Sequence, residues 1–173
     1  HKTECLVLIS VEEKSPSGKL AELDTKLKGI LNSSFKNKRF EGKLNQTLLL
    51  NTTKPMRADH LLLVGLGKGN EITADKLRQA AGTAAKYAEK AKLTTISFYI
   101  PADNDAKDIH TGLAKSNESF TQTVVEGGLL SLHHFDEYKQ PAKEKLSWIK
   151  QIILITTVKS QVSSMRSSSA KGQ

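Results

Sequence analysis

The amino-acid sequence predicts an α/β domain with three layers, α/β/α, built on a mixed, mostly parallel sheet. Short continuous apolar runs, which are typical of strands covered on both faces, recur along the chain. Segments with apolar residues at helical spacing lie between these runs. The length of 173 residues suits one domain with a sizeable core.

The clearest strand–loop–helix unit starts with the apolar run at residues 61–64. Gly65, Gly67 and Gly69 follow directly, as a sharp exit from the carboxyl end of a strand requires. Thr73 is a suitable N-cap for the helix that comes next. The helix carries one apolar stripe, formed by Leu77, Ala80, Ala81, Ala84, Ala85 and Ala88. This narrow, alanine-lined face predicts close packing of the helix against the sheet.

The N-terminal part of the chain predicts a strand over residues 4–11 and then a helix. Ser15 and Pro16 supply a cap and a proline for the first turn, and the helix should run to about Asn32. Its buried stripe is Leu20, Leu23, Leu27, Ile30 and Leu31. A basic loop is expected over residues 35–43. A strand follows at residues 46–51, for which residues 40–44 are one candidate partner.

The second half predicts a strand over residues 94–100, which is β-branched and aromatic and ends before Pro101. Residues 103–115 are polar and suit a loop with a short helical turn. A helix follows, with apolar residues at Phe120, Val124, Val125, Leu129, Leu130 and Leu132. Gly127 and Gly128 inside this helix permit close packing.

The last predicted strand covers residues 151–158, so the domain is expected to span residues 1–158. Residues 159–173 are rich in serine and lysine and are expected to form a polar linker or tail.

The formal net charge of +8 is unevenly distributed. From Lys139 onward the chain has seven Lys or Arg residues against one acid, Glu144. A second basic cluster comprises Lys36, Lys38, Arg39 and Lys43. A solvated surface is the main interpretation, and DNA binding by the basic end is the alternative.

Cys5 is the only cysteine, so a disulfide within the chain is impossible and a buried, inert thiol is expected. The sequence has no apolar run long enough for a membrane span and no signal-peptide pattern. Together these features predict a cytoplasmic protein without membrane association.

Four segments together resemble the N-terminal domain of the leucyl aminopeptidase family. They are VGLGK at residues 64–68, LRQAAGTAA at 77–85, VVEGGLL at 124–130 and FDEYK at 135–139. Each motif alone is weak, but their joint occurrence in this order is fairly specific. The resemblance covers residues 6–158. It departs from the family pattern at Ser131, which replaces a common glycine, and at His133 and His134, where an aromatic and a basic residue are usual.

The resemblance implies a fold shared with ADP-ribose-binding macro domains, so the domain should be macro-domain-like. It also implies a parent enzyme that removes N-terminal residues from peptides with two divalent metal ions, zinc or manganese. The family's catalytic segment NTDAEGR is absent from residues 1–173 and belongs to a C-terminal catalytic domain. The expected partners are therefore this catalytic domain and further copies in a hexamer, in which the N-terminal domain aids assembly and limits access to the active sites. Peptide substrates would bind elsewhere, and residues 159–173 would lead toward the absent domain.

The best local candidate for a binding site is the glycine loop, with Gly65, Gly67, Lys68 and Gly69. Main-chain N–H groups between a strand and a helix can hold a phosphate, and Lys68 adds a positive charge. The loop matches neither a Walker motif nor G-x-G-x-x-G. A plain tight turn is the main interpretation, and a nucleotide- or ADP-ribose-binding module is the alternative.

No residue of the chain is predicted to be catalytic or to bind a metal or cofactor. The histidines His60, His110, His133 and His134 show no metal-ligand spacing, and packing roles are expected for them. Asp136 is expected to cap a turn. No Ser/His/Asp or Cys/His grouping has a persuasive spacing.

Overall fold

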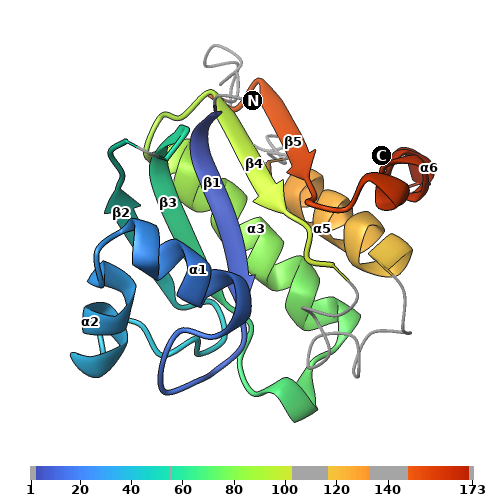
Figure 1. Cartoon of the computed structure of the whole chain (residues 1–173). Coiled ribbons are helices and arrows are strands. Elements are labelled where there is room, and N and C mark those ends of the chain that lie inside the picture. The colour runs from blue at the N-terminus through green and yellow to red at the C-terminus, as the bar shows by residue number, and fades with distance from the viewer. Residues whose placement is uncertain (1–2, 55, 103–116, 133–147, 172–173) are drawn as a thin grey trace, which may run out of the picture.

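The computed structural model describes residues 3–54, 56–102, 117–132 and 148–171. Within these ranges, five strands form one sheet in the order β2-β3-β1-β4-β5 (Figure 1). The strands are β1 (Thr3–Ser10), β2 (Thr47–Asn51), β3 (Ala58–Gly65), β4 (Thr95–Tyr99) and β5 (Gln151–Ile155). β1 pairs in parallel with both β3 and β4, and β4 pairs in parallel with β5. β2 is antiparallel to β3, so the predicted mixed, mostly parallel sheet is confirmed.

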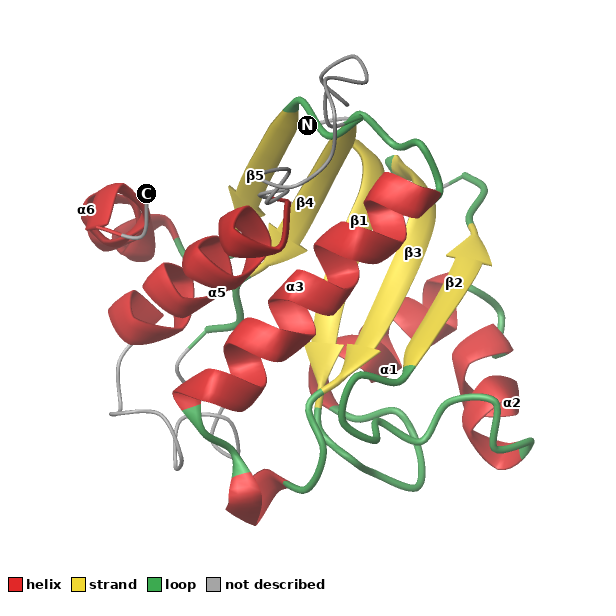
Figure 2. Cartoon of the chain, turned by 180° about the vertical axis from the view of Figure 1, so that it is seen from behind, coloured by secondary structure: helices red, strands yellow, loops and turns green. Residues whose placement is uncertain are grey.

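Helices cover both faces of this sheet, which confirms the three-layer architecture. Figure 2 shows α3 (Ala74–Lys90) and α5 (Asn117–Leu132) across one face, with α1 (Gly18–Lys26) and α2 (Ile30–Lys36) behind the sheet. α6 (Val162–Lys171) lies beside α5. Two short 3₁₀ turns, η1 (Gly69–Glu71) and η2 (Lys159–Gln161), precede α3 and α6. No helix of the described ranges is long and apolar enough to cross a membrane.

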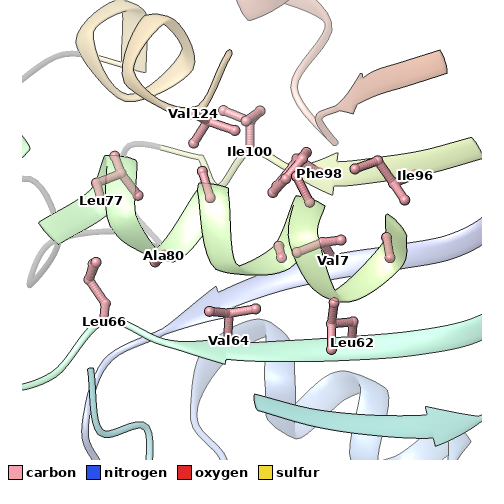
Figure 3. Close-up of a cluster of buried hydrophobic side chains, with 14 of the residues drawn as sticks. Val7, Leu62, Val64, Leu66, Leu77, Ala80, Ile96, Phe98, Ile100 and Val124 are labelled. Atoms are coloured by element: carbon pink, nitrogen blue, oxygen red, sulfur yellow. The ribbon is translucent and has the colours of Figure 1, made fainter. Parts of the chain in front are cut away.

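α3 forms as its sequence predicts. Thr73 is its N-cap, and the Thr73 hydroxyl accepts a hydrogen bond from the Lys76 N–H. The alanine stripe is fully buried and faces the sheet (Figure 3), where strand side chains including Val7, Leu62 and Phe98 gather around α3. The small side chains allow the helix axis to lie close to the strands.

The two helices on this face also meet closely. The Gly127 Cα lies so near the Arg78 main chain that a Cβ would overlap the Arg78 carbonyl oxygen. Beside this contact the Arg78 Nε donates to the Glu126 carboxylate at 2.7 Å, and the ion pair lowers the pKa of Glu126. The expectation that Gly127 permits close packing is confirmed.

The prediction of a single helix that ends near Asn32 is wrong, because the chain turns between α1 and α2. Lys28 and Gly29 have φ angles of 54° and 83°, which interrupt a right-handed helix. The Asp24 carboxylate accepts hydrogen bonds from the Leu31 and Asn32 N–H groups and so caps the second helix.

Two further expectations about this region are corrected. α2 continues to Lys36 and takes the first two residues of the predicted basic loop. The strand at residues 47–51 pairs with β3, and residues 40–44 are not its partner. Leu48 and Leu50 pack into the core on one face of the sheet, and Leu49 packs into the core on the other face, so β2 contributes to both.

The segment after β5 is also more ordered than its composition predicts. Its serine content argues against a helix, yet α6 forms over Val162–Lys171. Met165 and Ser168 are buried, which shows that tertiary packing against α5 decides the conformation. The role of residues 159–173 as a linker stays a prediction, but within it residues 162–171 are helical.

Candidate functional site: the glycine loop and its groove

The glycine loop leaves the sheet at the carboxyl end of β3, beside the end of β1. Gly65 is the last residue of β3 and is paired in register with Ser10. In open α/β sheets, ligands bind most often outside the carboxyl ends of the strands. The position of the loop therefore fits a binding site, and its hydrogen bonds decide what it can bind.

Three amides of the loop are already engaged by the main chain. The Gly65 N–H donates to the Gln46 carbonyl at 2.8 Å, and the Leu66 N–H donates to the Ser10 carbonyl at 2.8 Å. The Gly67 N–H donates to the Gly42 carbonyl at 2.9 Å. A phosphate cradle needs free N–H groups that converge on one point. These three amides instead join the loop to β1 and to residues 42–46.

The glycines of the loop are required by this close packing. A Cβ on Gly65 would overlap the carbonyl oxygen of Lys43. Gly67 has a φ angle of 83°, a left-handed conformation that glycine adopts without strain. The Gly67 carbonyl in turn accepts a hydrogen bond from the Glu12 N–H at 2.8 Å. Both glycines thus allow the loop to pack closely against residues 42–46 and the segment after β1.

A groove of about 610 Å³ lies beside the loop, and Lys68, Gly69 and Asn70 form part of its wall. The remaining lining comes from the segment after β1 and from the α2 region: Glu12, Glu13, Lys14, Phe35, Lys36, Lys38 and Glu41. The lining thus includes four lysines and three glutamates. The lining is nearly balanced in charge.

Some of these charges are paired locally. Lys68 is 64% exposed and lies 3.8 Å from Glu71, and Lys43 lies 2.6 Å from Glu41. The hydrogen bond from Lys43 lowers the pKa of Glu41 and raises the pKa of Lys43. These exposed ion pairs are worth little in stability. Glu71 partly neutralises Lys68 and Lys43 partly neutralises Glu41, so the groove stays nearly balanced in charge.

The site residues predicted from the sequence therefore fall into two groups, those that line the groove and those that are buried. Lys68 and Gly69 line the groove, whereas Gly65 and Gly67 are buried. Lys36 and Lys38 of the basic cluster also line the groove.

Sequence reasoning missed Glu12, Glu13, Lys14 and Glu41. The signal available for the first three was their place directly after the first strand, because the carboxyl ends of parallel strands meet at one edge of the sheet.

The other candidates lie away from this groove or outside the described residues. The His60 Nδ1 is 3.0 Å from the Asn51 Oδ1, so this ring links β3 and β2. Cys5 is fully buried, and burial raises the pKa of its thiol to about 12. His110, His133, His134 and Asp136 lie outside the described residues, as does the basic segment 139–147. DNA binding by the basic end stays a prediction.

A metal centre would require several ligand side chains placed close together. In the described ranges, no group of three or more His, Cys, Asp or Glu side chains is placed to hold an ion. A two-metal hydrolytic site needs several such ligands around ions about 3.5–4 Å apart. The described residues do not provide such a ligand set.

Comparisons with known proteins address the family. The model of the cytosol aminopeptidase family, N-terminal domain, matches residues 7–142. A probable cytosol aminopeptidase of Geotalea uraniireducens (strain Rf4) is 38% identical over 124 residues, which are 72% of this chain and 23% of that protein. One of Geobacter sp. (strain M21) is 33% identical over 156 residues, which are 90% of this chain and 29% of that protein. The chain thus spans about a quarter of the length of these relatives.

Solved structures confirm the fold. A tomato leucine aminopeptidase mutant superposes over 99% of this chain and 33% of its own with a TM-score of 0.67 at 15% identity. A Trypanosoma brucei macrodomain in complex with ADP-ribose covers 96% of this chain and 63% of its own, with a TM-score of 0.64 at 14% identity. The macro-domain-like architecture is therefore confirmed. Because the family model matches most of the chain, this protein belongs to the cytosol aminopeptidase family and carries its N-terminal domain.

Proposed function

We propose that the chain is the non-catalytic N-terminal domain of a longer leucyl aminopeptidase, a two-metal exopeptidase that releases N-terminal residues from peptides. The family match over residues 7–142 carries this proposal. The short span of the chain within its relatives supports it, because most of each relative lies outside the matched region.

Catalysis is assigned to the remainder of the longer protein. Two divalent ions, zinc or manganese, would there activate a water molecule for attack on the peptide bond. This assignment rests on the resemblance in the sequence.

The proposed role of the domain is architectural. It would help to assemble a hexamer in the cytoplasm and limit access of peptides to the active sites. The hydrogen bonds that join the glycine loop to β1 and residues 42–46, and the close contact of α3 with α5, suit such a scaffold. Its partners would be the catalytic domain of the same chain and the neighbouring subunits.

An activity assay tests this proposal. The full-length protein, encoded by the native reading frame that contains this chain, should hydrolyse a leucyl-anilide substrate with added manganese or zinc. Residues 1–173 alone should not hydrolyse it. The same assay on a mock purification from the host controls for contaminating aminopeptidase. Metal-dependent turnover by the 173-residue chain above that background would refute the proposal.

One observation favours a second function, a nucleotide- or ADP-ribose-binding module. The fold is that of macrodomains, and Lys14, Lys36, Lys38 and Lys68 line a groove at the carboxyl edge of the sheet. Three glutamates in the same groove and the engaged amides of Gly65 and Gly67 weigh against it. Titration with ADP-ribose separates the two functions.

A further inference from the structure

Among the strands of the described residues, β5 lies at the edge of the sheet and has one neighbour, β4. The Gln151 N–H donates to the Thr94 carbonyl, and the Ile155 carbonyl accepts from the Ile100 N–H. In a parallel pair, every second residue turns both main-chain groups toward its neighbour. The main-chain groups of Ile152 and Leu154 therefore point to the open side, and in the described part of the chain no hydrogen bond engages them.

A groove of about 600 Å³ follows this open side. Six consecutive residues, 151–156, line it. Successive side chains of a strand point to opposite faces, so a continuous run of lining residues shows that the groove follows the edge of the strand. The other wall comes from α5 and α6. Val125, Leu129, Val162 and Met165 make it mostly apolar, and Arg166 and Ser169 of α6 add polar groups.

The strand itself lacks two features that often prevent strand addition, a charged side chain and a proline. Its sequence is QIILI. In the wall, Leu129 is 38% exposed and Val162 is 43% exposed. α6 thus covers the apolar surface of α5 and β5 incompletely. An extended segment placed here would pair with Ile152 and Leu154 and bury the exposed wall.

We propose that this edge docks an extended segment from the remainder of the longer aminopeptidase, which adds beside β5 as a further strand. The inference rests on the proposed function. The chain covers only 23% and 29% of two relatives, and the matched domain is the N-terminal one, so in such proteins the remainder follows α6. α6 lines the groove, and a tethered segment there has a high effective concentration.

A second copy of this chain suits the edge less well. Its formal net charge is +8, so two copies repel each other at low ionic strength. A segment of the same polypeptide does not carry that penalty.

Hydrogen exchange tests the docking. Peptides covering residues 151–156 are compared by mass spectrometry between the full-length protein and the 173-residue chain. We expect exchange at Ile152 and Leu154 to be at least about tenfold slower in the full-length protein. Leu129→Lys places a charge in the wall and should remove this protection. Leu130→Lys is the matched control, because Leu130 is 68% exposed and is not part of the wall.

The outcomes separate the two proposals. Protection that L129K removes and L130K preserves supports the docking. An active full-length protein whose β5 edge exchanges as fast as in the 173-residue chain overturns the docking and leaves the proposed function intact. A third outcome is that protection of the β5 edge in the 173-residue chain rises with protein concentration and that analytical ultracentrifugation shows a dimer. This outcome overturns the docking of a segment of the longer protein and favours pairing with a second copy of the chain. A full-length protein without aminopeptidase activity refutes the proposed function, whatever the exchange shows.

Discussion

The glycine loop and the edge of β5 both present main-chain groups at the border of one sheet, and they differ in whether the chain itself satisfies them. At the loop, the N–H groups of Gly65, Leu66 and Gly67 donate to carbonyls of neighbouring segments. At the edge, the main-chain groups of Ile152 and Leu154 point outward into a mostly apolar groove. The loop carries the more familiar motif, but the edge has the free groups that a partner needs.

The comparison shows that a motif indicates a site only when its donors remain available. A glycine loop after a strand is compatible with phosphate binding and with tight packing. In this domain carbonyls of neighbouring segments lie within 3 Å of the Gly65, Leu66 and Gly67 amides, so packing engages these three donors.

The largest effect is expected at Gly65. Gly65→Ala places a methyl group on the Lys43 carbonyl oxygen, so the main chain must move, and we expect a loss of about 3 kcal/mol or more in the free energy of unfolding. Gly18→Ala is the control, because no atom lies within 4 Å of the added Cβ and the φ angle of 47° costs about 1 kcal/mol. Equal losses in urea denaturation would show that the loop is not tightly packed.

The adjacent glycines of α5 give a smaller, paired effect. Gly127→Ala meets the Arg78 main chain and should cost about 1–3 kcal/mol. Gly128→Ala meets only the Ile152 Cδ1 at 3.4 Å, so the better helix propensity of alanine should stabilise by roughly 0.5–1 kcal/mol. Thermal unfolding of both variants checks the opposite signs. The same sign for both would contradict the helix contact described above.

A still smaller effect concerns pH. The Glu4 carboxylate accepts hydrogen bonds from the Thr94 hydroxyl and N–H, and these bonds lower its pKa from 4.5. A folded-state pKa below the unfolded one gives stability that is present above about pH 4.5 and is lost as the pH falls through the lowered value. We expect Glu4→Gln to flatten the stability curve in this acidic range. An unchanged curve would argue against the link between β1 and β4.

The smallest expected effect is that of added ADP-ribose. Calorimetry with the 173-residue chain should show no tight binding, because the amides of Gly65 and Gly67 are engaged. Micromolar affinity that Lys68→Ala weakens would contradict the account of the loop. Lys54→Ala, at an exposed lysine that does not line the groove, controls for the loss of one charge.

The strands and the long helix α3 could be predicted from the sequence because their patterns are local. Leu61–Val64 forms an unbroken apolar run and the Ala80, Ala84 and Ala88 stripe repeats at helical spacing, and both are buried as expected. The break between α1 and α2 was missed because Lys28 takes a positive φ, which is rare for lysine. α6 was missed because its serines disfavour a helix and packing of Met165 on its neighbours overrides them.

The candidate site was predictable only in part. The position of Gly65 and Lys68 after a buried strand indicated the correct edge of the sheet. That Gln46 and Gly42 take the loop amides depends on contacts between segments about 20 residues apart, which no local pattern encodes. The open groove beside β5 likewise depends on where α6 packs.

Hydrogen exchange by NMR on the 173-residue chain tests the central difference most directly. We expect the amides of Leu66 and Gly67 to exchange near the rate of global unfolding and those of Ile152 and Leu154 to exchange orders of magnitude faster. ADP-ribose should change neither set. Fast exchange at Leu66 and Gly67 that slows with ADP-ribose, together with protected amides at Ile152 and Leu154, would contradict the account.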